Sequence, residues 1–364
     1  MAVLSVAIAL SAAAATASHA ETSSWVHREP TTTETPSARP KPGPRRAEAK
    51  PSAGPDLLGP NSSAHSKGFD TRPLPKPATT PPPEKDDPFL AFDQGRYLTA
   101  LKLAEDRAKT GDVRAHTLVA RIHAEGLGVT KNDALAASWY KRAAELGDVD
   151  AQFAYGVILA EGRGVQKDRA GAADMFERAA RTGHAAANYN LGVLFLKGDG
   201  KPENPVRAAQ HIAYAAEKGV AQAQYDLAGL YQQGVGVPHD AVETSRWLKA
   251  AAEQGMPAAQ YEYAVLLLKG LGLRADEPRA VDYMKAAADK GIPGAQNRLA
   301  HIYREGIGVD PSRTEAAKWR LISKASGFGD DKVLDDLLQA LSETERAQAE
   351  VAAVQWQRRQ MAPF

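Results

Sequence analysis

The chain has 364 residues, of which 43% are apolar and 24% are charged, an ordinary composition for a globular protein of one to three domains. Its formal net charge is only +1, which argues against nucleic acid as a partner because no excess of basic side chains is available to neutralise phosphates. Cysteine is absent, so disulfides, thiolate metal sites and thiol catalysis are excluded.

The first residues are typical of an export signal. An apolar, alanine-rich run covers residues 2–17 and leads to Ser18-His19-Ala20, a small-x-small cleavage pattern in front of Glu21. The run is shorter than the roughly 20 apolar residues of a membrane-spanning helix. We therefore expect residues 1–20 to be a signal peptide cleaved near Ala20, a periplasmic or secreted product, and no membrane span after cleavage. An uncleaved N-terminal anchor is the alternative.

Residues 21–87 are rich in proline, with 14 of the chain's 23 prolines, and show no apolar periodicity. Such a segment buries too little apolar surface to offset its ordering entropy, so it is predicted to be a disordered linker. It could serve as a tether. Alternatively, its basic stretch at residues 39–50, RPKPGPRRAEAK, could contact the cell wall or a protein partner.

From residue 88 onward the chain repeats itself with a period of 36 residues. The motif G-x-G marks each unit, and it recurs at Gly126/Gly128, Gly162/Gly164, Gly198/Gly200, Gly234/Gly236, Gly270/Gly272 and Gly306/Gly308. A fixed period of this length is the signature of a solenoid. Six units are predicted, at residues 113–148, 149–184, 185–220, 221–256, 257–292 and 293–328.

Each unit carries two helical patterns separated by the G-x-G turn. Asp112 and Asp148 are candidate N-caps, Pro257 and Pro293 suit a first helical turn, and the stretch from Ser312 to Glu315 reads as a capping box. Because the terminal units of a solenoid must turn a polar face to water, we expect shortened ends. These are an N-terminal capping helix pair at residues 88–112 and C-terminal capping helices at residues 329–360.

The repeat resembles the Sel-one-like repeat family, a relative of the tetratricopeptide repeat. The resemblance rests on units such as AQAQYDLAGLYQQGVGVPHDAVETSRWLKAAAEQG and covers residues 113–328. It implies an all-α fold, a right-handed α-solenoid of 36-residue helix-turn-helix repeats. It also implies a protein-binding scaffold, often exported in bacteria. The partner does not follow from the repeat class, because a fold alone does not carry a function.

The candidate chemical sites are weak. The G-x-G turns follow helices rather than strands, so they are predicted to be turns and not phosphate loops. Ser138 and Lys141 match the S-x-x-K pattern of penicillin-binding enzymes, but the K-T-G at residues 109–111 lies upstream of them and no S-D-N occurs. His116 and His123 lie about 10 Å apart along one helix, too far for one metal ion. No catalytic residue, metal site or cofactor is predicted.

The strongest candidate is a surface on the first helices, along offsets that line the concave groove in tetratricopeptide arrays. Three offsets, the fifth, ninth and twelfth residues of these helices, supply Phe153, Tyr189, Tyr225, Tyr261 and Asn297, then Val157, Val193, Val265 and His301, then Leu196, Gln232 and Leu268. Aromatic anchors of this kind suit an extended peptide or a partner helix. The alternative is that the aromatic rings only pack between neighbouring units.

These observations favour a non-catalytic protein-interaction scaffold or regulator of the bacterial envelope, which binds a protein or peptide on its concave face. The alternative is a binder or enzyme directed at peptidoglycan or penicillin, of the type represented by cysteine-rich repeat proteins. This chain lacks the cysteines of those proteins.

Overall fold

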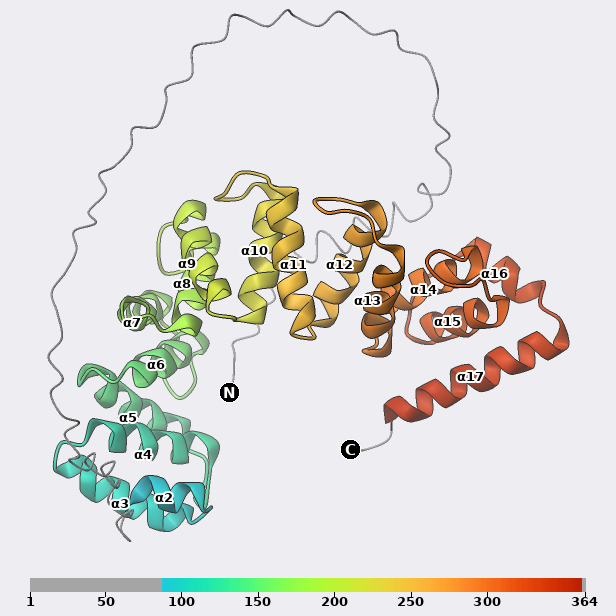
Figure 1. Ribbon diagram of the computed structural model, residues 1–364. Helices are drawn as coiled ribbons and strands as arrows, with labels where there is room; N and C mark the ends of the chain where they lie inside the picture. Colours follow the sequence, from blue (N-terminus) through green and yellow to red (C-terminus); the bar gives the residue numbers. More distant parts are fainter. Residues whose placement is uncertain (1–86, 362–364) are drawn as a thin grey trace, which may run out of the picture. The chain divides into compact units, whose positions relative to one another are not determined.

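The computed structural model describes residues 87–361, so the predicted signal peptide of residues 1–20 and the predicted linker up to residue 86 lie outside the described residues. The described residues form sixteen α-helices and no strand (Figure 1). Two helices, α2 (Pro88–Asp93) and α3 (Tyr97–Lys109), precede the repeats, and α16 (Lys332–Gln339) and α17 (Glu343–Met361) follow them. The predicted all-α solenoid with short ends is confirmed.

Between these ends lie six helix pairs, and every helix in them has 13 residues. The first helices of the pairs are α4 (Val113–Glu125), α6 (Val149–Glu161), α8 (Ala185–Lys197), α10 (Ala221–Gln233), α12 (Pro257–Lys269) and α14 (Pro293–Glu305). The second helices are α5 (Asp133–Glu145), α7 (Arg169–Arg181), α9 (Pro205–Glu217), α11 (Ala241–Glu253), α13 (Glu277–Asp289) and α15 (Arg313–Ala325).

Local capping sets the ends of these helices. Each first helix stops at the first glycine of its G-x-G, such as Gly162, which adopts the left-handed conformation at φ 77°. The second helix then starts at a polar N-cap, such as Asp168, whose carboxylate accepts a hydrogen bond from the Gly171 N–H at 2.8 Å. The predicted caps Asp112, Asp148 and Ser312 all accept hydrogen bonds from the first turn of their helices. The sequence therefore determines helix length locally, before any packing.

Each first helix packs against the second helix of its own pair, and each second helix packs against the next first helix. Small residues permit the close approach. A Cβ added to Gly192 would lie 2.7 Å from the Cγ1 atom of Ile212 on the facing helix, and Ala215 and Ala216 are almost fully buried. Consecutive pairs thereby build a continuous apolar core, as expected for a solenoid whose repeats contact only their neighbours.

The second glycine of each G-x-G contacts the preceding repeat. Gly236 has φ +70°, and a Cβ on it would overlap the carbonyl oxygen of Pro205, the first residue of α9. Gly272 meets the carbonyl group of Ala241, the first residue of α11, in the same way. The turn of one repeat thus rests on the backbone of the preceding second helix, with no room for a side chain between them.

A second link between repeats comes from the fourth residue of the first helices. In α6, α10, α12 and α14 this residue is a buried glutamine whose Nε2 donates to a carbonyl oxygen in the last turn of the preceding second helix. The pairs are Gln152 with Ala144, Gln224 with Ala216, Gln260 with Ala252 and Gln296 with Ala288, at 3.1–3.4 Å. Each bond satisfies a carbonyl that the end of a helix would otherwise leave without a partner.

The C-terminal end is closed by polar and aromatic contacts. Arg320 on α15 is fully buried and donates two hydrogen bonds of 2.9 Å to the carboxylate of Asp335 on α16. It also donates to Asn297 Oδ1 at 3.1 Å. Trp356 of α17 packs edge-on against Trp319, and its Nε1 donates to Asp289 at 2.8 Å. The cap is therefore joined to the last two second helices.

Two alanine substitutions in one turn test the contact of the second glycine. Gly234 and Gly236 both have φ +70°, but a Cβ on Gly234 meets nothing closer than 3.5 Å. Gly234→Ala is expected to lower the unfolding free energy by only about 1 kcal/mol, because alanine is strained in the left-handed conformation. Gly236→Ala should cost about 1–3 kcal/mol more because of the overlap with Pro205. Urea unfolding of the two variants measures the difference, and equal losses would contradict the proposed role of the contact.

A second test concerns the buried arginine. Arg320→Ala leaves the Asp335 carboxylate and the Asn297 oxygen without their donor, so a loss of about 3–5 kcal/mol in unfolding free energy is expected. The double variant Arg320→Leu with Asp335→Leu should recover much of that loss because no unpaired charge remains. A single variant as stable as the original chain would show that the ion pair does not hold the cap.

Candidate functional site

The predicted surface residues lie on the first helices, in one set for every repeat. Positions are counted here from the first residue of each first helix, so that Ala185 is position 1 of α8 and Tyr189 is position 5. Position 5 is occupied by Phe153, Tyr189, Tyr225, Tyr261 and Asn297 on α6, α8, α10, α12 and α14. These residues therefore occupy the same position in five successive first helices.

The two central tyrosines of this row join neighbouring repeats. The Tyr189 ring is 1% exposed, and its hydroxyl donates to the carboxylate of Asp226 on α10 at 2.8 Å. The Tyr225 hydroxyl donates in the same way to Glu262 on α12 at 2.5 Å. Asp226 and Glu262 both occupy position 6 of the repeat that follows. These tyrosines therefore pack between repeats, and whether a partner also touches them stays a prediction.

The other predicted residues differ in exposure. The half-buried Phe153 ring stacks on the His184 ring at 4.7 Å, and Tyr261 is also half-buried. At positions 9 and 12, Val157 and Val193 are buried, Val265, Leu196 and Leu268 are half-buried, and Gln232 is exposed. The row is therefore only partly accessible to a partner.

Asn297 and His301 in the last repeat contact the C-terminal cap. Asn297 Nδ2 donates to an Asp331 carboxylate oxygen at 2.8 Å, and His301 Nε2 lies 2.7 Å from the same oxygen. Burial alone would raise the pKa of Asp331, but the hydrogen bonds from His301 and Asn297 outweigh it and hold this pKa well below its usual range. These two residues stabilise the start of α16, and binding to a partner is an additional prediction for them.

Positions 2, 6, 9 and 13 share one side of each first helix, because their spacings of four, three and four residues follow the helical repeat. In α10 they are Gln222, Asp226, Gly229 and Gln233, and each retains exposed surface. Leu227 and Leu230, at positions 7 and 10, are buried in the core. We call the residues at these four positions in α8, α10 and α12 the open face: Ala186, Asn190, Val193, Lys197, Gln222, Asp226, Gly229, Gln233, Ala258, Glu262, Val265 and Lys269.

Position 6 was missed by the sequence analysis, although it carried a signal. Asn190, Asp226, Glu262 and Arg298 are polar side chains that directly follow the position 5 row. Asp226 and Glu262 accept the tyrosine hydroxyls, but Asn190, only 4% exposed, forms no side-chain hydrogen bond with any described residue. The reason lies one repeat earlier, where Phe153 replaces the tyrosine and offers no hydroxyl.

Gly229, at position 9 of α10, is unusual among the glycines inside helices. A Cβ on Gly156 or Gly192 would lie 2.7 Å from a facing side chain, whereas a Cβ on Gly229 would meet nothing within 4 Å. Glycine inside a helix costs about 0.5–1 kcal/mol relative to alanine. Packing within the described residues therefore does not explain why this position lacks a side chain.

Comparison with known proteins identifies the repeat. The family model described as Sel1 repeat matches six times, at residues 113–148, 149–184, 185–220, 221–256, 257–292 and 293–319. The chain belongs to the Sel1 repeat family. The last match ends directly before the buried Arg320. Sel1 repeat proteins generally act as protein-interaction scaffolds.

Comparison with solved structures gives two similar chains. A Sel1 repeat protein from Oxalobacter formigenes is similar at 28% identity and a TM-score of 0.56, over 67% of this chain and 96% of that one. A protective antigen of uropathogenic Escherichia coli with an SLR fold is similar at 25% identity and a TM-score of 0.48, over 74% of this chain and 68% of that one. No curated protein matches.

The other motifs of this Sel1 repeat chain have local roles. Ser138 Oγ donates to the Leu135 carbonyl at 2.7 Å, and Lys109 pairs with Asp106.

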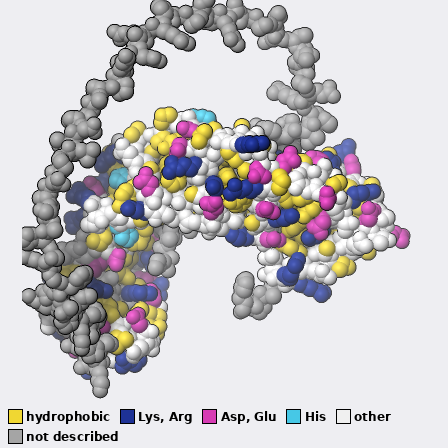
Figure 2. Space-filling model, viewed as in Figure 1, with side chains coloured by type: hydrophobic (Ala, Val, Ile, Leu, Met, Phe, Trp, Pro, Cys, Tyr) yellow, Lys and Arg dark blue, Asp and Glu magenta, His cyan; other side chains and the backbone are white. Residues whose placement is uncertain are grey.

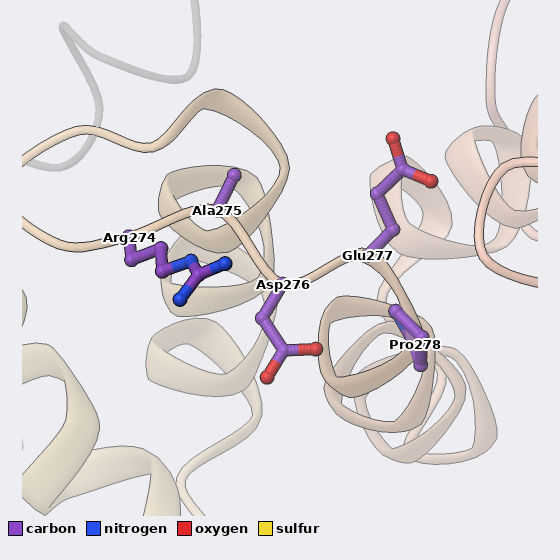
Figure 3. A pocket seen from close by; sticks show the side chains of 5 residues that line it. All are labelled: Arg274, Ala275, Asp276, Glu277 and Pro278. Atoms are coloured by element: carbon purple, nitrogen blue, oxygen red, sulfur yellow. The ribbon is translucent and has the colours of Figure 1, made fainter.

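Within residues 87–361 no three His, Asp or Glu side chains gather as metal ligands, and no helix is both long and apolar enough to cross a membrane. The hollow at residues 274–278 lies where the loop after α12 meets the first turn of α13, and the Asp276 and Glu277 carboxylates there point in opposite directions (Figure 3). Charges of both signs are interspersed over the visible face (Figure 2).

Burial shapes the electrostatics of the open face. It raises the pKa of Asp226 to about 6, although hydrogen bonds from Tyr189 and Gln222 and the charge of Lys197 act in the opposite direction. Burial likewise raises the pKa of Glu262, against the hydrogen bond from Tyr225. No cation of the described residues forms an ion pair with either carboxylate, so both are held in the fold by hydroxyl and amide donors alone.

The raised pKa of Asp226 predicts a pH dependence of stability. The folded state holds this proton up to about pH 6, whereas the unfolded chain releases it near pH 3.8. The stabilising contribution is thus present below pH 3.8 and lost as the pH rises through 6, a change of up to about 3 kcal/mol. Asp226→Asn should remove this loss of unfolding free energy. The variant should therefore be more stable than the original chain at pH 7.5. Urea unfolding at pH 4 and 7.5 measures it, with the exposed Asp282→Asn as the control that should leave the pH dependence unchanged.

Proposed function

We propose that this Sel1 repeat protein is a non-catalytic scaffold of the bacterial envelope that binds a peptide or partner helix on the open face. The export pattern of residues 1–20 supports the envelope location. The family supports a protein as the partner.

One observation carries the choice of surface. The same four positions recur on α8, α10 and α12. On α10 and α12 they are half-buried or exposed and combine apolar side chains such as Val265 with polar ones such as Gln222 and Gln233, whereas on α8 Asn190 and Val193 are buried. At the roughly 10 Å spacing of packed helices, a segment lying across them would meet an equivalent set of groups at regular intervals. Regular spacing of this kind suits a long, continuous ligand better than a small molecule.

The tyrosines fit this function as supports. Because the Tyr189 and Tyr225 hydroxyls are bonded to Asp226 and Glu262, their rings are held in place before a partner arrives. A surface ordered in advance loses less conformational entropy on binding. The most informative residues for a test are therefore the accessible ones at positions 9 and 13, since replacing Tyr189 or Tyr225 would also disturb the contact between repeats.

Photo-crosslinking in cells tests this proposal. A photoreactive residue in place of the exposed Gln233, on the open face, is expected to give a discrete adduct with a protein identified by mass spectrometry. The same residue in place of the exposed Asp282, on the second helix α13, is the matched control and should give none. Adducts of equal yield from both positions, or from position 282 alone, would place the binding surface elsewhere.

A further inference from the structure

The first helix of the third repeat, α8, has a histidine as its N-cap. The Nδ1 atom of His184 accepts a hydrogen bond from the Ala187 N–H at 3.1 Å. A ring nitrogen accepts a hydrogen bond only through its lone pair, so Nδ1 carries no proton and the proton of the neutral ring is on Nε2. The cap therefore exists only while His184 is neutral.

The other first helices begin differently. The side chains of Asp112 and Asp148, which cap α4 and α6, offer an acceptor oxygen whether or not they carry a proton. The N-cap residues of α10, α12 and α14 are Val220, Met256 and Ile292, which form no side-chain cap. Histidine is also the side chain whose ordinary pKa, about 6.5, lies closest to neutral pH. Among the described first helices, the cap of α8 is therefore the one that a proton would remove near neutral pH.

Side chains of α6 surround the His184 ring. The Phe153 ring stacks on it at 4.7 Å, with an interplanar angle of 28°. Its Nε2 lies 3.8 Å from the carboxylate of Asp150, which is largely exposed. Burial lowers the pKa of His184, and the charge of Asp150 opposes this effect only in part. The surroundings therefore favour the neutral ring that the cap requires.

The two helices that pack against α8, α7 and α9, also carry charged or titratable side chains. In the second half of α7, Glu177 and Arg181 pair with each other at 2.9 Å. On α9, the Tyr214 hydroxyl donates at 3.3 Å to the main chain one residue before His184. The charge that acts on His184 comes from Asp150 and not from these groups.

A second histidine at the same junction responds to acid in another way. His211 Nδ1 lies 2.9 Å from Asn188 Oδ1. Because Asn188 Nδ2 donates to the carbonyls of Ala180 and His184, the Asn188 oxygen is the acceptor and His211 Nδ1 is the donor. A protonated ring keeps that N–H, so proton uptake by His211 leaves its contact in place.

The histidine cap lies where the second repeat meets the third. The His184 N–H donates to the Ala179 carbonyl in the last turn of α7 at 3.2 Å. The Asn188 amide joins the His184 carbonyl to the Ala180 carbonyl in the same turn. The last turn of α7 and the first turn of α8 are therefore linked through His184.

We propose that His184 is an acid-sensitive cap that makes the junction between the second and third repeats respond to pH. A proton from solvent takes the Nδ1 lone pair, the Ala187 N–H turns to water, and the first turn of α8 is released. This device goes beyond the proposed function and does not depend on it, because it requires no partner.

The expected pH dependence has a definite sign. Because the pKa of His184 is lowered in the folded chain, its stabilising contribution is complete above the unfolded pKa of about 6.5 and is lost as the pH falls below that value. Asp226 changes in the opposite direction, because its raised pKa makes the fold more stable in acid. Unfolding of the whole chain would mix the two effects, so a local measurement is needed.

Hydrogen exchange of the Ala187 amide provides that measurement. NMR of the full-length chain gives the protection factor of this amide, which compares its exchange rate with that of an unstructured chain at the same pH. The protection factor is expected to fall about fivefold between pH 7.5 and pH 4.5, the factor that corresponds to the loss of one N-cap. The His184 N–H should lose protection in the same range, because it links the same turn to α7.

Two variants at residue 184 separate the cap from other effects of acid. His184→Asn keeps a capping oxygen that takes up no proton, so Ala187 should be protected equally at both pH values. His184→Ala removes the cap, so the protection should be low at both. The Ala151 amide, which donates to the Asp148 cap at 2.7 Å, is the reference in every sample and should not change.

Three outcomes would count against the acid-sensitive cap. Full protection of Ala187 in the original chain at pH 4.5 would overturn it. An equal fall in the His184→Asn variant would do the same, because the acid effect would then come from another group. If Ala187 loses protection in acid but the His184 N–H does not, the release stops within the first turn of α8 and the response of the junction is wrong.

Discussion

The contact between the second glycine of each G-x-G and the first residue of the preceding second helix sets the geometry on which the rest of this fold depends. Gly236 lies against Pro205 and Gly272 against Ala241, with backbone touching backbone. No side chain intervenes, so the distance between neighbouring repeats does not change with the sequence around it. A side chain at this point would separate the repeats, and the same constraint applies at Gly164, Gly200 and Gly308.

Constant spacing lets the other contacts recur at the same offsets. The position 4 glutamines reach a carbonyl eight residues earlier in four repeats. Where Asn188 replaces glutamine, it still reaches Ala180, and its oxygen in turn contacts His211 Nδ1 at 2.9 Å. The backbone therefore tolerates a change of side chain, and only the local hydrogen bonds are rearranged. Repeats can then vary in chemistry along the face without a change of fold.

The sequence predicted the architecture well because a repeat is a local unit. The 36-residue period and the caps at Asp112, Asp148 and Ser312 each depend on a few neighbouring residues, and both were confirmed. The functional surface was harder to predict. The period shows that Tyr189 and Tyr225 share a helix face, but not how that face is rotated toward the next helix. That rotation turns their hydroxyls toward Asp226 and Glu262, and it leaves Gly229 partly exposed.

In a repeat protein the residues that break the pattern carry more information than those that keep it. The tyrosine–carboxylate pairing holds α8, α10 and α12 together, and it is interrupted once at each side, by Phe153 before Asn190 and by Arg298 after Tyr261. Each interruption leaves one polar group without a partner, and both groups lie on the first helices of the same three repeats. The Asn190 amide and the Tyr261 hydroxyl therefore keep hydrogen-bonding capacity that the contacts between repeats do not use. The most specific part of the surface is therefore where its regular internal bonding stops.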